Sequence, residues 1–204
     1  MLPNGTFVLG GAASGKSEWA EKLILSSGLN VTYLATGRVG DQETAQRVKI
    51  HKARRDERWH TLEAPLDLGP PLAGLNADTP VLIDCATMWL SNQMMIDADI
   101  DSATDDLLNA LCDCAAPWVI VSNEVGHGIV PDNKLARRFR EAQGRLNIAL
   151  ARQADLAVMV IAGLPQVLKG TLPCQPGIGC ATGPRMKNHL SDGAMYLPIC
   201  PMPR

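Results

Sequence analysis

Residues 10–17, GGAASGKS, fit the pattern G-x-x-x-x-G-K-[ST], with Gly10, Gly15, Lys16 and Ser17 at its fixed positions. Glycines let a backbone wrap around a polyphosphate so that its N–H groups point at the phosphate oxygens. A lysine here binds the terminal phosphates, and the following serine can ligate Mg²⁺. A glycine-rich turn that fits by accident is the alternative, but the flanking residues have the strand and helix character that the pattern requires. We therefore predict that this loop, which also contains Gly11, Ala12, Ala13 and Ser14, binds a nucleoside triphosphate.

An acidic residue that could complete this site is Asp84, at the end of the apolar run VLIDC (81–85). A carboxylate at the end of a buried strand can hold Mg²⁺ or its water shell beside the serine of such a loop. The alternative is that Asp84 caps the helix that follows. The two roles are compatible.

A second candidate is the loop SNEVGHGIVPDN (122–133), which follows the apolar run 118–122. Parallel sheets bind their ligands at the carboxyl ends of their strands. Asn123 and Glu124 could act there, and Gly126 and Gly128 allow close approach of the backbone to a substrate. An ordinary polar loop between a strand and a helix explains these residues equally well. His127 alone is more typical of an exposed loop histidine than of a catalytic base.

The most basic part of the chain is RVKIHKARRDERWH (47–60), with four arginines, two lysines and two histidines. Such charge runs are usually solvated surface. The alternative is that one histidine reacts with a phosphorylated ligand, and the stretch alone does not decide between the two.

The net charge of the whole chain is −2, which does not favour a nucleic-acid partner or a membrane surface.

The length of 204 residues and the hydrophobic content of 46% suit one compact domain. The N-terminus does not resemble a signal peptide, and no apolar run is long enough to span a membrane, so we expect a cytoplasmic protein. The six cysteines include no CxxC pair, so we expect free thiols and no zinc site.

Short β-branched runs alternate with longer amphipathic ones. Strands are predicted over 6–10, 31–35, 81–85, 118–122 and 156–162, and helices over 16–25, 102–115 and 133–154. Ser102 and Asp105 have the spacing of a capping box for the second helix. This alternation predicts an α/β fold, a P-loop NTPase-like three-layer domain with a mainly parallel sheet. Residues 65–80 are rich in proline and glycine and are predicted to be a surface connection.

We expect residues 1–169 to form this domain. Residues 170–204 contain many prolines and glycines and no sustained period, so they are predicted to be a loosely ordered tail.

Several sequence blocks run in order from about residue 6 to Lys169: FVLGGAASGKSEWAE, YLATG, RVKIHKARRDERWHTLE, LIDCATMWLSN, VSNEVGHGIVPDNKLARRFREAQGRLN and AD…VIAGLP…LK. Together they resemble the bifunctional adenosylcobinamide kinase / adenosylcobinamide-phosphate guanylyltransferase family of cobalamin biosynthesis. The resemblance implies that a corrinoid, adenosylcobinamide, is phosphorylated with ATP or GTP. GMP then passes from GTP to a histidine and on to the new phosphate, giving adenosyl-GDP-cobinamide. A homo-oligomer is also implied.

The family's guanylylated histidine lies in an H-[RK]-x-x-R block, which makes His51 the expected nucleophile. A neutral imidazole attacks phosphorus readily, and neighbouring cations offset the charge on the phosphate oxygens. His60 is interpreted as surface packing. Asp56 stands where the family usually has proline, which puts the local loop shape in question. Nucleotide contacts are implied at Ala35, Thr36, Gly37, Lys52, Ala53, Arg54, Arg55 and Glu63.

Two other functions fit parts of the sequence. One is a P-loop kinase with a single activity on another small alcohol, and the other is a non-catalytic, nucleotide-dependent regulator. The guanine-reading motif [NT]KxD of switch GTPases is missing, because the closest match, NKLA at 133–136, ends in Ala136. This absence argues against the usual regulatory GTPases.

Overall fold

The structure is a computed structural model that describes residues 1–37 and 55–173. Residues Met1–Pro173 form one compact unit. The predictions for His51, Lys52, Ala53, Arg54 and the 170–204 tail beyond Pro173 therefore lie outside the described residues. No helix within the described ranges is both long and apolar enough to cross a bilayer.

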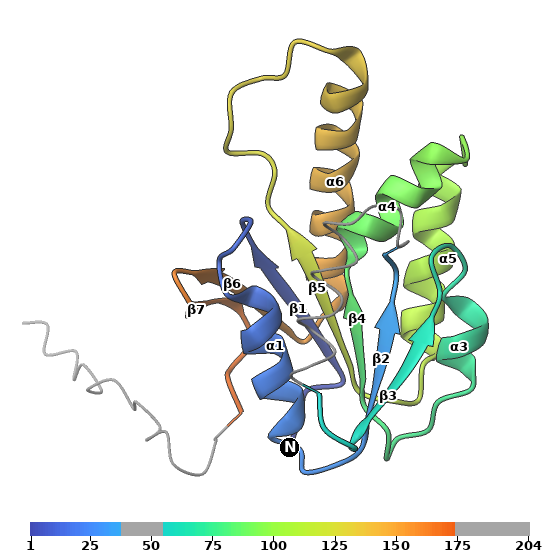
Figure 1. Cartoon of the computed structure of the whole chain (residues 1–204), viewed down its shortest axis with the longest axis vertical. Coiled ribbons are helices and arrows are strands. Elements are labelled where there is room, and N and C mark those ends of the chain that lie inside the picture. Colours follow the sequence, from blue (N-terminus) through green and yellow to red (C-terminus); the bar gives the residue numbers. More distant parts are fainter. Residues whose placement is uncertain (38–54, 174–204) are drawn as a thin grey trace, which may run out of the picture. The chain divides into compact units, whose positions relative to one another are not determined.

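A seven-stranded sheet forms the centre of this unit, in the order β3-β2-β4-β5-β1-β6-β7 (Figure 1). Every neighbouring pair is parallel except β6 and β7, which are antiparallel. The α/β prediction with a mainly parallel sheet is confirmed. The strands are β1 (Gly5–Gly10), β2 (Val31–Ala35), β3 (Trp59–Glu63), β4 (Val81–Asp84), β5 (Trp118–Asn123), β6 (Leu156–Ile161) and β7 (Leu164–Lys169).

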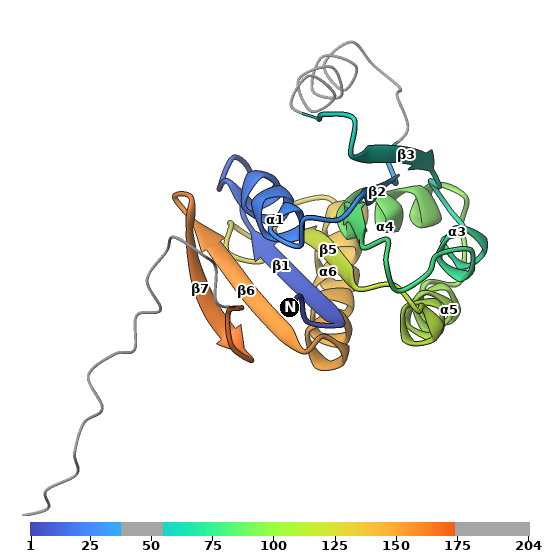
Figure 2. The same cartoon turned by 90° about the horizontal axis from the view of Figure 1, so that it is seen from below.

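Helices cover both faces of the sheet (Figure 2). On one face, Ala20, Leu23 and Ile24 of α1 pack on the central strands. The opposite face carries a larger core that contains Trp89 of α4 and Leu146 of α6. The helices are α1 (Lys16–Leu25), α3 (Gly69–Ala73), α4 (Ala86–Met95), α5 (Ile100–Asp113) and α6 (Lys134–Gln153).

Three elements were not predicted. β3 and β7 are edge strands with few buried side chains, so they lack the apolar run that marks an interior strand. α3 is a five-residue helix with prolines in its first turn, inside the segment 65–80 that was predicted to be a surface connection. Prolines suit the start of a helix because their missing N–H would be unpaired there anyway. The helix expected after Asp84 is α4, which only Cys85 separates from β4.

The predicted capping box of α5 is wrong. The helix begins at Ile100, and the carboxylate of Asp99 accepts hydrogen bonds from the N–H groups of Asp101 and Ser102, at 3.1 Å each. Aspartate is as good an N-cap as serine, so the local sequence offered two competing starts.

The helix predicted over 133–154 is confirmed as α6, with Asn133 as its N-cap. Leu135, the first apolar residue of this helix, is not buried, however, and is 66% exposed. The buried side chains lie further along, and they include the polar Gln143 and Asn147. The first turns of α6 therefore extend beyond the core.

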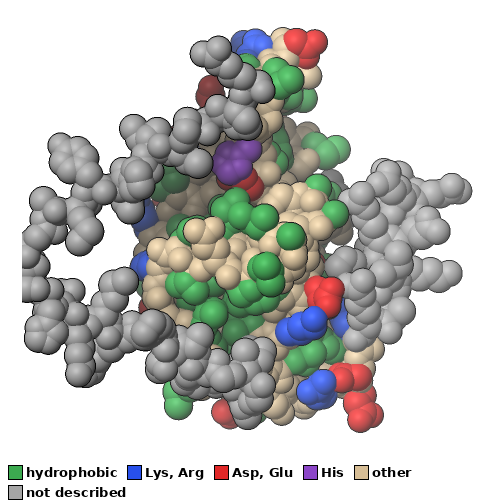
Figure 3. All heavy atoms as spheres, turned by 90° about the vertical axis from the view of Figure 1, so that its left-hand side faces the viewer, with side chains coloured by type: hydrophobic (Ala, Val, Ile, Leu, Met, Phe, Trp, Pro, Cys, Tyr) green, Lys and Arg blue, Asp and Glu red, His purple; other side chains and the backbone are tan. Residues whose placement is uncertain are grey.

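Strand β7 is an edge strand with hydrophobic side chains in solvent. Leu164, Val167 and Leu168 are exposed, and in Figure 3 hydrophobic side chains gather on the side of the molecule that faces the viewer. The ammonium group of Lys169 donates to the carbonyl oxygens of Ala151 and Arg152 at the end of α6, which ties β7 to the rest of the unit. A lysine there also balances the negative end of the helix dipole.

Candidate nucleotide-binding site

The glycine-rich loop connects β1 to α1, as the pattern requires. Gly15 is the N-cap of α1 and has a φ of 88°, in the left-handed region that favours glycine. The N–H of Gly163, in the turn between β6 and β7, donates to the carbonyl oxygen of Ser14 at 2.8 Å. This hydrogen bond connects the glycine-rich loop to that turn. The loop therefore presents the start of α1, and its unpaired N–H groups, at the carboxyl end of β1.

The glycines of the loop differ in how strictly they are required. A Cβ on Gly10 would lie 2.5 Å from the Ser14 hydroxyl and 2.7 Å from the carbonyl oxygen of Val160, so no side chain fits there. A Cβ on Gly11 would meet no atom within 4 Å. The hydroxyl oxygen of Ser14 is buried and hydrogen-bonds no described atom. A phosphate oxygen would satisfy it.

Lys16 and Asp84 lie close enough to interact electrostatically. The Lys16 ammonium donates to the carbonyl oxygen of Gly11 at 3.0 Å. Partial burial lowers the pKa of Lys16, while the neighbouring Cys85 and Asp84 raise it. Burial, followed by the charge of Asp84, raises the pKa of the Cys85 thiol to about 12, so that thiol is protonated and inert. Lys16 and Asp84, which the sequence pattern assigns to one site, are thus neighbours.

Asp84 lies before the N-cap position of the next helix, because Cys85 holds that position and α4 begins at Ala86. One carboxylate oxygen of Asp84, Oδ2, accepts a hydrogen bond of 3.1 Å from the hydroxyl of Tyr33. The side chain is therefore bonded at the strand ends and does not hold the N-cap position, which favours the site role over the capping alternative.

The sheet register places further predicted residues at this edge. Ala35 is the register partner of Glu63 on one side and of Asp84 on the other. Because all three strands are parallel, their carboxyl ends coincide here. Glu63 is exposed, and Gly37 is the last described residue before the segment 38–54.

The ATG turn after β2 is held by buried hydrogen bonds. The Thr36 hydroxyl donates to the carbonyl oxygen of Cys85 and accepts from its N–H, both at 2.8 Å. The side-chain amide of Asn92 donates to the Thr36 carbonyl oxygen at 2.7 Å. Sequence reasoning missed Asn92. A buried asparagine in an apolar helix signals a hydrogen-bonding role, but the sequence does not show that the residue is buried.

The loop after β5 begins directly beside the glycine-rich loop. Asn123 is the register partner of Gly10, and the N–H of Glu124 donates to the Gly10 carbonyl oxygen at 3.0 Å. The Glu124 carboxylate accepts from the N–H of Gly126. Two of the four candidate residues of this loop, Asn123 and Glu124, therefore lie at the same edge as the glycine-rich loop.

Arginines of α6 fix the rest of this loop. Arg140 donates to the Gly126 carbonyl oxygen, and Arg137 donates to the carbonyl oxygens of Pro131 and Asp132 at 2.9 and 2.6 Å. No atom lies within 4 Å of a Cβ built on Gly128, which leaves open space beside that residue. The loop is thus held at both ends.

A cavity of about 570 Å³ lies between this loop, the end of α4 and the start of α6. Met94, Met95, Leu135 and Phe139 give it an apolar lining, and Ser91, Asn133 and Arg140 add polar groups. A volume of this size accommodates a small-molecule ligand or part of a larger one. The cavity was not predicted from the sequence, because its lining combines residues of two helices and a loop that are separate in the chain.

Tyr33 is the other residue that sequence reasoning missed. It lies in the run VTYLA, which reads simply as a buried strand, and only 8% of its surface is exposed. Burial, then Asp84, raises the pKa of the Tyr33 phenol far above its usual value, against the opposing effect of Arg55. A tyrosine in a buried strand needs a hydrogen-bond partner for its hydroxyl, and this requirement could have indicated that Tyr33 contacts a polar residue.

Arg55 lies over the ring of Tyr33. Its guanidinium carbon is 3.2 Å from the centroid of the Tyr33 ring and 5.7 Å from that of Trp59. Asp56 accepts hydrogen bonds from the N–H and guanidinium of Arg58. The exposed Asp56–Arg58 pair thus shapes the turn before β3.

Both histidines that the sequence assigned to the surface are exposed, since His60 on β3 and His127 in the loop after β5 are in solvent. Of the predicted nucleotide contacts, the structure brings together those on the glycine-rich loop, the ends of β2, β3 and β4, and Arg55. His51, Lys52, Ala53 and Arg54 belong to the segment that the structure does not describe.

Comparison with known proteins agrees with this geometry. The family model "Cobinamide kinase / cobinamide phosphate guanyltransferase" matches residues 6–168. The bifunctional adenosylcobalamin biosynthesis protein CobP of Pseudomonas aeruginosa is 42% identical over 166 residues, which cover 80% of this chain and 96% of that protein. The proteins named CobU from Salmonella typhimurium and Escherichia coli are 39% and 36% identical, over 79% of this chain and 98% of each relative. The chain therefore belongs to the cobinamide kinase / cobinamide phosphate guanyltransferase family.

Proposed function

We propose that this chain phosphorylates adenosylcobinamide with ATP or GTP and then transfers GMP from GTP to the new phosphate, giving adenosyl-GDP-cobinamide. Membership of the family supports both activities. The observation that carries the proposal is the arrangement of the glycine-rich loop, Lys16 and Asp84 at one edge of the sheet. Because ATP and GTP are cytoplasmic metabolites, we place the protein in the cytoplasm.

In the kinase step, the hydroxyl oxygen of the aminopropanol arm attacks the γ-phosphorus. The bond from that phosphorus to the β,γ-bridging oxygen breaks, and the hydroxyl proton is released. Lys16 stabilises the negative charge that develops on the phosphate oxygens, which is the main contribution a protein makes to phosphoryl transfer. The N–H groups at the start of α1 bind the same oxygens. Gly10 to Ser17 are the residues we assign to this step.

The donor set at the loop suits a magnesium ion. Ser17 offers a hydroxyl oxygen and Asp84 a carboxylate oxygen, both hard ligands of the type that Mg²⁺ prefers. When bound, the ion would neutralise charge on the β- and γ-phosphates. The electrostatic effect of Asp84 on Lys16 supports placing both around one triphosphate.

In the guanylyl transfer, we assign the nucleophile to His51. A ring nitrogen attacks the α-phosphorus of GTP, the bond to the pyrophosphate oxygen breaks, and pyrophosphate leaves. The phosphate of adenosylcobinamide phosphate then attacks the same phosphorus and frees the histidine. Lys52, Ala53, Arg54 and Arg55 are assigned to the nucleotide, together with the ATG turn, Glu63 and Asp84. The position of Arg55 beside Tyr33 and Asp84 supports this assignment.

We assign the corrinoid to the loop after β5, with Asn123, Glu124, Gly126 and Gly128 as candidate contacts. The hydrogen bond from Glu124 to Gly10 supports this choice, because it puts the loop next to the phosphate-binding residues. The adjacent apolar cavity offers room for part of a large substrate. We also expect a homo-oligomer, which light scattering on the purified chain would test.

The test is to incubate the protein with GTP labelled at the α-phosphate. Radiolabel that remains on the denatured protein, together with phosphorylation of adenosylcobinamide by ATP, is expected for the bifunctional enzyme. Phosphorylation without protein labelling would identify a kinase with a single activity. Neither reaction, with nucleotide binding intact, would identify a regulator.

A further inference from the structure

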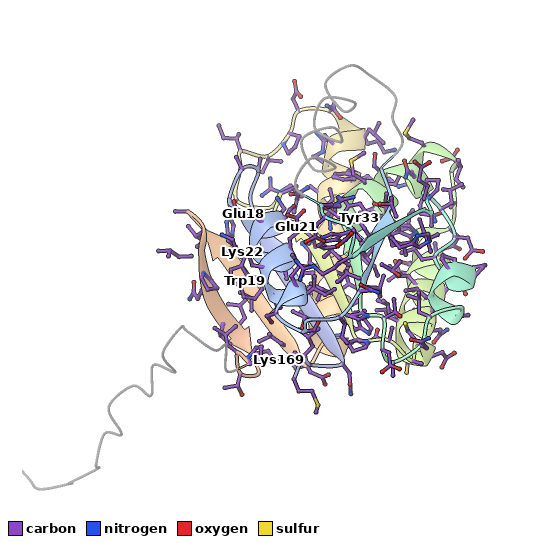
Figure 4. All side chains as sticks on the ribbon, turned by 60° about the horizontal axis from the view of Figure 1, so that its bottom comes forward. Glu18, Trp19, Glu21, Lys22, Tyr33 and Lys169 are labelled. Atoms are coloured by element: carbon purple, nitrogen blue, oxygen red, sulfur yellow. The ribbon has the colours of Figure 1, made fainter. Side chains whose placement is uncertain are left out.

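Tyr33 contacts two charged residues that come from different parts of the chain. Its hydroxyl donates to Asp84, at the end of β4, and its ring lies against the guanidinium of Arg55, which follows the segment that contains His51. Figure 4 shows Tyr33 on β2, and it packs in the same core as the apolar side chains of α1. The side chain thus lies between Asp84 and Arg55.

The contact with Arg55 holds the guanidinium against the face of the Tyr33 ring. A guanidinium that lies over an aromatic ring is attracted to the ring face and keeps its N–H groups in its own plane, pointing outward. The Nε of Arg55 is buried and hydrogen-bonds no described atom. The edge of the Trp59 ring approaches the Tyr33 ring, with centroids 6.3 Å apart and planes at 71°, and supports it from the side.

The contact with Asp84 fixes a carboxylate. A hydrogen bond to Oδ2 restricts rotation of the side chain, so the carboxylate keeps one orientation toward the glycine-rich loop. Phenylalanine would keep the ring and lose this bond. An aliphatic residue would lose both contacts. The two functions of Tyr33 can therefore be separated by substitution.

We propose that Tyr33 is a positioning residue that holds Arg55 and Asp84 in the relative geometry that binding of the guanine nucleotide requires. The inference rests on the proposed function, since it assumes that Arg55 and Asp84 bind one nucleotide. In this proposal Tyr33 makes no direct contact with the nucleotide. It acts through the charged residues on its two sides.

The experiment is a double-mutant cycle on nucleotide affinity. The ligand is the α,β-methylene analogue of GTP, which cannot transfer GMP, and its Kd is measured by calorimetry in the presence of Mg²⁺. Tyr33→Leu and Arg55→Ala are each expected to weaken binding about threefold to thirtyfold, because each removes the cation–aromatic contact. The double variant should bind about as well as the weaker single variant, since the same contact is lost only once.

Tyr33→Phe separates the two contacts. In the Tyr33→Phe protein, Arg55→Ala should raise the Kd by the same factor as it does in the wild type, because the aromatic ring remains. The Mg²⁺ concentration that gives half-maximal kinase activity should rise, and Tyr33→Phe should add little once Asp84→Asn is present, because the lost hydrogen bond acts only through that carboxylate. A role in packing alone would not produce this pattern. Should Tyr33→Leu fail to fold, Tyr33→Met, which fills a similar volume without a ring, takes its place in the cycle.

Two variants of the same strand serve as controls. Thr32→Val changes the neighbouring buried residue, and Leu34→Ala removes core contacts and lowers the unfolding temperature. Both should leave the Kd unchanged. Additive effects of Tyr33→Leu and Arg55→Ala would overturn the inference. A wild-type protein that binds the analogue but acquires no GMP from GTP would instead refute the guanylyl transfer. The interaction between Tyr33 and Arg55 in nucleotide binding could still be measured in that case.

Discussion

The ammonium group of Lys16 donates a hydrogen bond of 3.0 Å to the carbonyl oxygen of Gly11, across the glycine-rich loop. Partial burial makes the charged lysine less stable than it would be in water, as its lowered pKa indicates. A triphosphate that replaces the carbonyl oxygen as the partner of Lys16 would relieve that penalty. The loop is therefore organised for an anion before one binds.

Lys16→Ala should reduce the kinase rate by several powers of ten, because phosphoryl transfer depends mainly on positioning and on stabilisation of charge. Steady-state assays of adenosylcobinamide phosphorylation measure this loss. Lys22→Ala is the matched control, since Lys22 is an exposed lysine of the same helix that pairs with Glu18. A folded Lys16→Ala protein with a near-normal rate would mean that the active site lies elsewhere.

Gly10→Ala and Gly11→Ala should differ sharply in stability, although the residues are adjacent. The new Cβ at position 10 would collide with the Ser14 side chain and the Val160 backbone, and overpacking of this kind costs about 1–3 kcal/mol. The new Cβ at position 11 meets open space. Urea unfolding of the two variants gives the free energies. Equal losses of stability would contradict the loop geometry described above.

Asp84→Asn should raise the Mg²⁺ concentration needed for half-maximal activity, because an amide oxygen binds the ion more weakly than a carboxylate oxygen. A titration of the kinase reaction with Mg²⁺ gives this value. Asp106→Asn, at an exposed position of α5, is the control. If Asp84→Asn only lowers the unfolding temperature and leaves the metal dependence unchanged, then Asp84 is a structural residue.

The sequence was sufficient to predict the parallel sheet, its five interior strands and the glycine-rich loop. Those strands are continuous apolar runs, and the loop has fixed spacing. The edge strands β3 and β7 were missed because exposed strands carry no such run. Tyr33 and Asn92 were missed for another reason. Their roles depend on partners that are distant in sequence, Asp84 and Thr36, and no local pattern encodes such contacts.

A chain that ends after Lys169 should fold cooperatively and keep its activity, if residues 170–204 are a tail as predicted. Lys169 is retained in this variant, and so are its hydrogen bonds to the end of α6. A chain that ends after Pro173 is the comparison, because the compact unit extends to that residue. Thermal unfolding and kinase assays measure both. Loss of cooperativity in the shorter chain alone would move the boundary to Pro173.

The central claim is that His51 carries GMP, and mass spectrometry of the intact protein after incubation with GTP and Mg²⁺ tests it most directly. One GMP should be added to the protein, through a bond that is labile to acid and stable to alkali, as expected for a phosphoramidate. His51→Ala should abolish the adduct and spare much of the kinase activity, which needs no covalent histidine. His60→Ala, at an exposed histidine of β3, should leave the adduct in place. An adduct that persists in the His51→Ala protein would contradict the account.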